Sequence, residues 1–181
     1  MGQSGDRFMT DNRIWLFDTT LRDGGQTRGV DFSHADKIAI SHALDEIGID
    51  YVEGGWPGAN PTDDAFFGNP PALKNASMVA FGMTRRGGRS AANDPGLNAV
   101  LDAQVPATCL VGKTWDFHVE TALKTSLEEN LEMIRQSVAA ARERGRESMF
   151  DCEHFFDGYK NNPAYAIDCA RAAHDGGAAW I

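Results

Sequence analysis

The stretch Asp-Thr-Thr-Leu-Arg-Asp-Gly-Gly-Gln, residues 18–26, decides how the fold of this sequence is interpreted. It follows the apolar run Ile14-Trp15-Leu16-Phe17, which predicts a strand buried on both faces. Arg22 and Asp23 would then emerge at the carboxyl end of that strand, where α/β enzymes keep their chemistry. The two glycines let backbone and ligand approach closely. An adjacent cation and anion suit an oxyanion beside a metal ion, and the alternative is a loop ion pair or a cap for the next helix.

The composition is that of an ordinary globular protein. A chain of 181 residues with 42% apolar and 24% charged side chains is long enough for one domain with a hydrophobic core. The formal net charge of -9 argues against nucleic acid or an anionic membrane as the main partner. No apolar run approaches the roughly twenty residues that span a bilayer, and no signal peptide is visible, so we expect a cytoplasmic protein. We expect residues 1–13 to be a flexible leader and residues 14–181 to form one domain.

The three cysteines do not indicate metal or redox chemistry. Cys109, Cys152 and Cys169 fall in predicted strands or a helix and lack C-x-x-C spacing. We therefore expect buried, reduced thiols in place of disulfides or a zinc site.

Predicted strands and helices alternate along the chain. Ser33 caps a helix that runs to about Ile47, with Asp36 completing a capping box. Apolar side chains four, three, four and three residues apart predict the clearest helix, from Ser126 to about Arg144. The remaining elements are strands at residues 51–55, 78–83, 108–112 and 148–154, short helices near 62–67 and 96–103, a helix opened by Pro163, and the first step of a sixth strand at 180–181. This order predicts a parallel sheet with right-handed crossovers, either an open doubly wound sheet or part of an eight-stranded barrel.

Five motifs carry a resemblance to one enzyme family, and they occupy residues 18–26, 51–58, 81–86, 111–116 and 151–160. The first resembles the opening strand of the acyl-CoA condensing and lyase family, which includes isopropylmalate, homocitrate and citramalate synthases. The motifs YVEGGWPG and DCEHFFDGYK point to the citramalate synthase branch of that family. The similarity covers about residues 12–181. It implies an α/β fold, a (β/α)8 TIM barrel, of which this sequence holds about the first five β/α units and the start of strand six.

The resemblance implies a Claisen condensation of acetyl-CoA with pyruvate that yields citramalate and CoA, an entry to isoleucine biosynthesis. A divalent cation, Mg²⁺ or Mn²⁺, would polarise the ketone. Asp23 matches the family's metal carboxylate, and Arg22 matches the arginine that stabilises negative charge on oxygen. Glu153 matches a catalytic glutamate at the end of the fifth strand, acting as general base or in its relay, with a purely structural carboxylate as the alternative. Gln26 and Glu53 would face the same mouth and hold substrate or orient the arginine.

The sequence lacks part of what the family uses. The family completes its metal site with a His-x-His pair on a later strand, and no such pair follows Asp23. We therefore expect the amino-terminal part of a longer enzyme, which would be a homodimer as family members usually are. Two alternatives stay open: 2-isopropylmalate synthase, which differs in the size of the keto-acid pocket, and an inactive half-barrel used only for binding or assembly. The basic run Arg85, Arg86 and Arg89 could by its charge meet CoA phosphates, or it could be a solvated loop.

Overall fold

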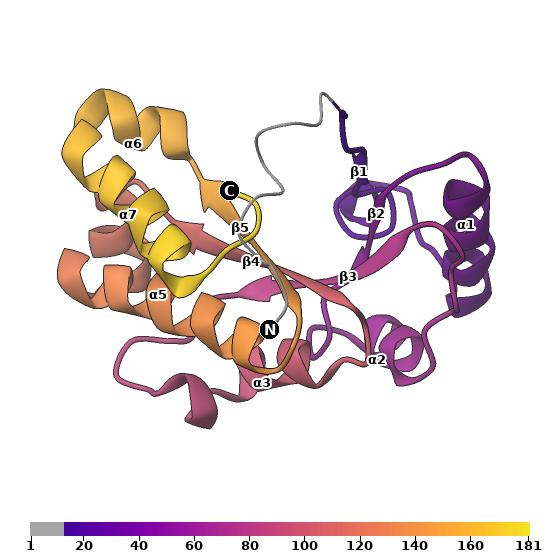
Figure 1. Cartoon of the computed structure of the whole chain (residues 1–181). Coiled ribbons are helices and arrows are strands. Elements are labelled where there is room, and N and C mark those ends of the chain that lie inside the picture. The colour runs from indigo at the N-terminus through magenta and orange to yellow at the C-terminus, as the bar shows by residue number, and fades with distance from the viewer. Residues whose placement is uncertain (1–12) are drawn as a thin grey trace, which may run out of the picture.

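Five parallel strands form a half-barrel in the computed structural model, which describes residues 13–181 (Figure 1). The strands are β1 (Phe17–Asp18), β2 (Tyr51–Gly55), β3 (Ser77–Met83), β4 (Ala107–Lys113) and β5 (Glu147–Glu153). They lie side by side in the order of the chain, β1-β2-β3-β4-β5. Trp180 adds one parallel bridge to Met149, in the position of a sixth strand. This sequential order is that of a barrel, so the barrel prediction is confirmed over the open doubly wound sheet.

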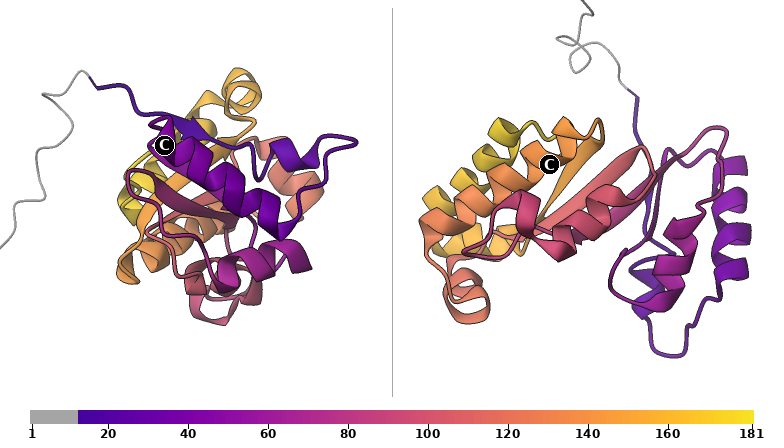
Figure 2. Two further views of the ribbon diagram at one scale, coloured as in Figure 1. Left: turned by 90° about the vertical axis from the view of Figure 1, so that its right-hand side faces the viewer. Right: turned by 90° about the horizontal axis from the view of Figure 1, so that it is seen from below.

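Helices connect the strands. They are α1 (His34–Glu46), α2 (Pro61–Gly68), α3 (Pro95–Asp102), α5 (Leu127–Glu143), α6 (Phe155–Asn161) and α7 (Pro163–Gly176), with 3-10 turns η1 (Gly24–Gln26) and η2 (Ala91–Asn93). The connection after β4 begins with α4 (Asp116–His118) and continues as a π-helix, η3 (Val119–Leu123). In Figure 2, α1 and α2 lie together beside β2, while α5 and α7 lie together beside β5.

Side-chain caps fix where the longer helices begin. The Ser33 hydroxyl accepts a hydrogen bond from the backbone N–H of Asp36, and the Asp36 carboxylate accepts one from the backbone N–H of Ser33. The predicted capping box is therefore present. The side chains that accept from the first turns of α2, α3, α5 and α7 in the same way are Asn60, Asp94, Ser126 and Asn162.

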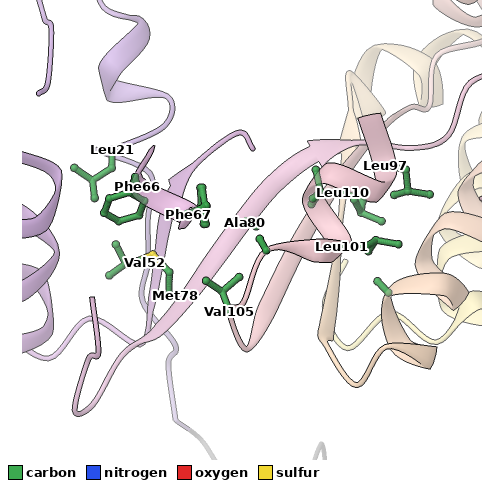
Figure 3. Close-up of a cluster of buried hydrophobic side chains, with 13 residues drawn as sticks. Leu21, Val52, Phe66, Phe67, Met78, Ala80, Leu97, Leu101, Val105 and Leu110 are labelled. Atoms are coloured by element: carbon green, nitrogen blue, oxygen red, sulfur yellow. The ribbon is translucent and has the colours of Figure 1, made fainter. Parts of the chain in front are cut away.

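Alternate residues of each strand face opposite sides of the sheet. Strand residues that face the helices pack with α2 and α3 in the cluster of Figure 3, which includes Val52, Phe66, Met78, Ala80, Leu97, Leu101 and Leu110. The intervening residues form a second cluster on the concave face: Tyr51, Val79, Phe81, Ala107, Cys109, Val111 and Met149. Glu53, Asp151 and Glu153 are in phase with this second set, so three carboxylates belong to the concave face.

Aromatic rings close the amino-terminal end of the half-barrel. The ring of Trp180 lies 5.9 Å from that of Trp15 and 6.3 Å from that of Tyr51, between centroids. The Tyr51 hydroxyl donates to Glu147 Oε1 at 2.9 Å, and the Trp180 indole N–H donates to the same oxygen at 3.1 Å. Burial, reinforced by the bond to Glu147, raises the pKa of Tyr51 to about 12. The start of β2, the start of β5 and residue 180 are thus tied together.

The first strand differs from its prediction. Only Phe17 and Asp18 pair with β2, and the four residues 14–17 are 40% to 81% exposed. The prediction of a strand buried on both faces was wrong, because β1 is the edge of the five-stranded sheet and no described residue covers its outer side. The predicted flexible leader lies outside the described residues except for Arg13, whose guanidinium pairs with Asp50.

Two further expectations concern cysteines and membranes. Cys109 and Cys169 are buried and Cys152 is half-buried, and all three are free thiols, in agreement with the prediction. Among residues 13–181, no helix has both the length and the apolar character needed to cross a membrane.

Candidate active site at the carboxyl ends of the strands

Arg22 is fixed in the loop that follows β1. The backbone N–H groups of residues 22–24 all donate to the carbonyl oxygen of Thr19, at 2.8–3.2 Å, and this tight turn aims the side chain at the sheet. The Arg22 Nε donates to Glu53 Oε2 at 2.6 Å, and its guanidinium lies 4.0 Å from the ring centroid of Phe81. The side chain is 16% exposed. A permanently charged group is therefore oriented in advance by a charge-assisted hydrogen bond and a cation–π contact.

Glu53 is the most deeply placed carboxylate of the site. It is 1% exposed on the concave face of β2. Burial raises its pKa, the hydrogen bond from Arg22 opposes that rise, and the neighbouring Asp151 and Asp23 carboxylates add to it. The sequence predicted that Glu53 either holds substrate or orients Arg22, and its hydrogen bond to Arg22 suits the second role.

Asp23 and Gln26 lie at the exposed rim. The Asp23 carboxylate is 61% exposed and accepts from Arg22 Nη1 at 3.1 Å. Gln26 ends the η1 turn and lines a cavity of about 350 Å³ that also reaches Arg22 and Asp63. Both side chains are thus near Arg22 and open to a ligand.

The donor set fits a divalent cation only in part. Asp23 offers an exposed carboxylate, the donor type that Mg²⁺ and Mn²⁺ prefer. Within the part of the chain that the structure describes, no three His, Cys, Asp or Glu side chains are grouped so that they could hold a metal ion. The described residues therefore offer the Asp23 carboxylate as a ligand but no cluster of three such side chains around an ion.

Glu153 is anchored to β4 through both its backbone and its side chain. Thr114 donates from its N–H and its hydroxyl to the Glu153 carbonyl oxygen, at 3.2 and 2.8 Å. The ammonium of Lys113 lies 2.5 Å from Glu153 Oε2. The next residue, His154, has the left-handed conformation with φ of 57°, and α6 begins immediately after it. Lys113, which the sequence did not single out, is thus the ion-pair partner of the predicted catalytic glutamate.

Gly158 lets α6 lie directly on the end of β4. A Cβ at this position would lie 2.5 Å from the carbonyl oxygen of Thr114 and 2.9 Å from the Cα of Trp115. Glycine is therefore required for the close approach of α6 to the segment that anchors Glu153.

Asp151 is a further acidic residue of the site that sequence reasoning missed. It lies two residues before Glu153 in β5 and therefore on the same face, a spacing that could have identified it. Asp151, Arg22 and Glu53 line one cavity of about 660 Å³, whose other walls include Met149 and Phe155. Partial burial raises the pKa of Asp151, and the charge of Arg22 opposes that rise.

A buried ion pair holds the loop after β2. Lys37 of α1 and Asp63 of α2 pair with each other, and the Lys37 ammonium also donates to the Gly54 carbonyl oxygen at 2.9 Å. Asp63 accepts from the backbone N–H of Trp56 at 2.9 Å. Gly55 has φ of 145°, and a Cβ there would lie 2.6 Å from Asp63 Oδ1. The Gly-Gly-Trp segment therefore has one well-defined path beside the candidate site.

The basic run after β3 is not one patch. Arg85 is 3% exposed, and its guanidinium donates to Glu129 and to Gln136, each at 2.7 Å. Arg86 and Arg89 are exposed. Arg85 is consequently a structural cation and is not available to CoA phosphates.

The arrangement as a whole has a clear chemical capacity. A fixed guanidinium at the edge of a cavity can stabilise negative charge that develops on an oxygen. A carboxylate fixed at the carboxyl end of β5 can accept a proton from an adjacent carbon acid. Of the five predicted site residues, Asp23, Gln26 and Glu53 lie around Arg22, through contacts or a shared cavity. Glu153 lies with Lys113 at the ends of β5 and β4, which β3 separates from β2.

Known sequences include relatives of this chain. The family model described as HMGL-like matches residues 13–181. The chain is 49% identical over 171 residues to the (R)-citramalate synthase of Aquifex aeolicus and 48% identical to that of Streptomyces coelicolor, with 93% of this chain and 32% of each relative covered. It is 34% identical to a 2-isopropylmalate synthase of Listeria monocytogenes over the same share of both chains. The chain thus spans about a third of the length of the curated relatives it matches.

Solved structures show the same fold. The hydroxymethylglutaryl-CoA lyase of Bacillus subtilis superposes with a TM-score of 0.72 at 17% identity, over 93% of this chain and 56% of that one. The lyase of Pseudomonas aeruginosa gives 0.69 at 19% identity, over 92% and 55%. These TIM-barrel neighbours extend well beyond the half-barrel described here.

Proposed function

The chain belongs to the HMGL-like family, and from that premise we propose that residues 14–181 form the first part of the catalytic barrel of an (R)-citramalate synthase. The proposed reaction condenses acetyl-CoA with pyruvate to citramalate and CoA and serves isoleucine biosynthesis. In the whole enzyme we expect a homodimer.

The observation that carries the proposal is the fixed guanidinium of Arg22 at the edge of the 660 Å³ cavity. A carbon–carbon bond forms when the acetyl methyl group loses a proton and attacks the ketone carbon, and negative charge then accumulates on oxygen. A guanidinium that is already oriented by Glu53 and Phe81 stabilises that charge without reorganisation. Hydrolysis of the thioester then releases CoA.

We assign the removal of the methyl proton to Glu153. Its backbone is fixed by Thr114 and its carboxylate is held by Lys113, so the group keeps one position at the carboxyl end of β5. A base must be placed within hydrogen-bond reach of the proton it removes, and a carboxylate anchored at both ends of the residue meets that need. Gln26, at the rim beside Arg22, is assigned to substrate binding.

Asp23 would supply one oxygen ligand to Mg²⁺ or Mn²⁺, which when bound polarises the ketone of pyruvate. The carboxylate is exposed and adjacent to Arg22, which is where the keto acid would have to lie. The remaining ligands would come from outside residues 13–181.

Pyruvate is favoured over 2-ketoisovalerate by the pattern of identities. Five (R)-citramalate synthases share 44% to 50% identity with the chain, while three 2-isopropylmalate synthases share 33% to 34% over nearly the same length. The difference supports the citramalate reaction, and 2-isopropylmalate synthase remains the alternative within the family.

The proposal can be tested by placing this chain in a complete enzyme. Residues 13–181 would replace the matching segment of the Aquifex aeolicus synthase, and CoA release would be measured with pyruvate or 2-ketoisovalerate, with and without Mn²⁺. The 181-residue chain alone would be assayed in parallel. We expect metal-dependent release with pyruvate from the chimera and a fall of about 10²- to 10³-fold for Arg22→Gln. Arg28→Gln, an exposed arginine on the same loop, is the matched control.

Three results would overturn the proposal. A preference of the chimera for 2-ketoisovalerate would show that the chain belongs to a 2-isopropylmalate synthase. Equal activity of Arg22→Gln and Arg28→Gln would remove Arg22 from the chemistry. A folded chimera that releases no CoA with either keto acid would leave only a binding or assembly role.

A further inference from the structure

The end of β4 is held by a buried polar network that reaches it from the helix side of the sheet. Asn130 of α5 donates from its side-chain Nδ2 to the carbonyl oxygen of Lys113, the last residue of β4, at 2.8 Å. The same Nδ2 donates its second hydrogen to the Tyr165 hydroxyl of α7, also at 2.8 Å. The network therefore joins two helices to the strand that ends beside Glu153.

The surroundings of this network are otherwise apolar. Asn130 is 0% exposed and Tyr165 is 6% exposed. Tyr165 packs in a cluster of buried side chains from η3, α5, β5 and α7, which contains Val119, Ile134, Val138, Phe150, Cys169 and Ala173. Burial raises the pKa of Tyr165, so its hydroxyl stays protonated at neutral pH. Two uncharged polar side chains are thus enclosed where α5 and α7 lie together beside the sheet (Figure 2).

Packing alone does not explain an amide at position 130. The Asn130 Oδ1 is buried and has no hydrogen-bond partner among residues 13–181. A buried polar atom without a partner lowers stability, and an apolar side chain would avoid that cost. What the amide supplies, and an apolar side chain cannot, is the bond to the Lys113 carbonyl oxygen.

From Lys113 the contacts lead directly to the carboxylate that we assign as the base. The Lys113 ammonium lies 2.5 Å from Glu153 Oε2, and the next residue, Thr114, donates from its N–H and its hydroxyl to the Glu153 carbonyl oxygen. The two charged side chains are 18% and 33% exposed, and a partly exposed ion pair restrains its members only weakly. The pairing of β4 with β5 also ends at Lys113 and Glu153, and strand ends open readily. Asn130 bonds to the backbone at this point.

We propose that Asn130 is a positioning residue of the candidate active site. It holds the end of β4, so that Lys113 and Thr114 keep Glu153 in place, and Tyr165 orients the Asn130 amide. Neither Asn130 nor Tyr165 touches the substrate. The inference rests on the proposed function, because it concerns the base of that reaction.

The first test is amide hydrogen exchange in the 181-residue chain, which requires no catalytic activity. Asn130→Leu removes the donor and keeps a branched side chain. We expect the Thr114 amide, which bonds to Glu153, to exchange about tenfold faster than in the unsubstituted chain at equal unfolding free energy. Ser137→Ala is the matched control, since Ser137 is also buried in α5 and accepts from the backbone N–H of Arg85. That variant should leave the exchange of Thr114 unchanged.

The second test measures kcat and KM in the chimera with the Aquifex aeolicus synthase. A displaced base slows the chemical step without changing substrate binding. Asn130→Leu should therefore lower kcat about 10- to 100-fold and leave KM for pyruvate and acetyl-CoA within about twofold. Tyr165→Phe keeps the bond from Asn130 to Lys113 and should lower kcat less. Ser137→Ala should leave kcat within about twofold.

The inference is wrong if the Thr114 amide of Asn130→Leu exchanges as slowly as that of Ser137→Ala. It is also wrong if exchange is faster but kcat falls no further than in Ser137→Ala, or if KM rises as much as kcat falls. A folded chimera that is inactive before any substitution would overturn the proposed function. Hydrogen exchange would then still decide whether Asn130 fixes the end of β4.

Discussion

Replacement of Gly158 by alanine sets two physical effects against each other. Gly158 lies inside α6, where helix propensity alone predicts that alanine stabilises by about 0.8–1 kcal/mol. The Cβ would however lie 2.5 Å from the Thr114 carbonyl oxygen and 2.9 Å from the Trp115 Cα, two backbone atoms that no rotamer change can move. Overpacking of this kind costs about 1–3 kcal/mol, and a backbone clash belongs at the upper end. We therefore expect Gly158→Ala to lower the free energy of unfolding by about 2 kcal/mol.

The measurement is urea unfolding of the 181-residue chain, monitored by circular dichroism. Gly68→Ala is the matched control, since Gly68 ends α2 and its Cβ would meet nothing within 4 Å. That variant should be neutral or stabilised by up to about 1 kcal/mol. In the chimera, Gly158→Ala should also slow CoA release, because Thr114 bonds to the backbone of Glu153. If Gly158→Ala is as stable as Gly68→Ala, the argument that α6 must touch β4 to position Glu153 is wrong.

Further predictions concern single residues. Arg22→Lys should slow CoA release by the chimera by about 10²-fold, because a lysine cannot keep both the Glu53 bond and the contact with Phe81; near-normal activity would contradict this. Asp23→Asn should weaken Mn²⁺ binding to the chimera, measured by calorimetry, without changing its circular dichroism; unchanged affinity would exclude Asp23 as a ligand. The Asp45 carboxylate accepts hydrogen bonds from the backbone N–H groups of residues 74–76, and these bonds, the one from Ala76 most strongly, hold its pKa below 3.8. The ionised carboxylate therefore stabilises the fold above about pH 4, and this stabilisation is lost as the pH falls further. Asp45→Asn should accordingly lower Tm by a large amount at pH 7 and by less and less as the pH falls below about 4, and a decrease in Tm that does not change with pH would refute the assignment. Because the pKa of Tyr51 is raised from 10.0 to about 12, the unfolded chain ionises first, and stability should fall between those pH values; Tyr51→Phe should flatten that part of the stability profile, and an unchanged slope would count against it.

The sequence predicted those parts of the fold that depend on local chemistry. Ser33 with Asp36, and Ser126 before α5, carry their own capping signals, and the structure starts both helices there. The short helix α6 was not predicted, since Phe-Phe-Asp-Gly-Tyr-Lys-Asn has a central glycine and no three-four spacing of apolar residues. The burial of β1 was predicted wrongly because it depends on neighbours that a single segment does not specify.

For the site, the same distinction between local and nonlocal information applies. The motif around Arg22 indicated a functional loop, and the alternation within β5 could have added Asp151. The bond between Arg22 and Glu53 joins residues 31 positions apart, and the pair of Lys113 with Glu153 requires the register of β4 on β5. Such contacts are decided by tertiary packing, so no pattern in the sequence could have specified them. Whether these residues act in catalysis stays a prediction.

The aromatic contact among Trp15, Tyr51 and Trp180 has a mechanical consequence. It spans the concave side of the sheet and links residues before β1 to the bridge beside β5. These contacts hold the sheet in its curved form, because the sheet cannot flatten without separating the rings and breaking the hydrogen bonds to Glu147. The arc is therefore bent before any further strand is added. Any further strand of a barrel would then be aligned along a curve that the first five strands already follow.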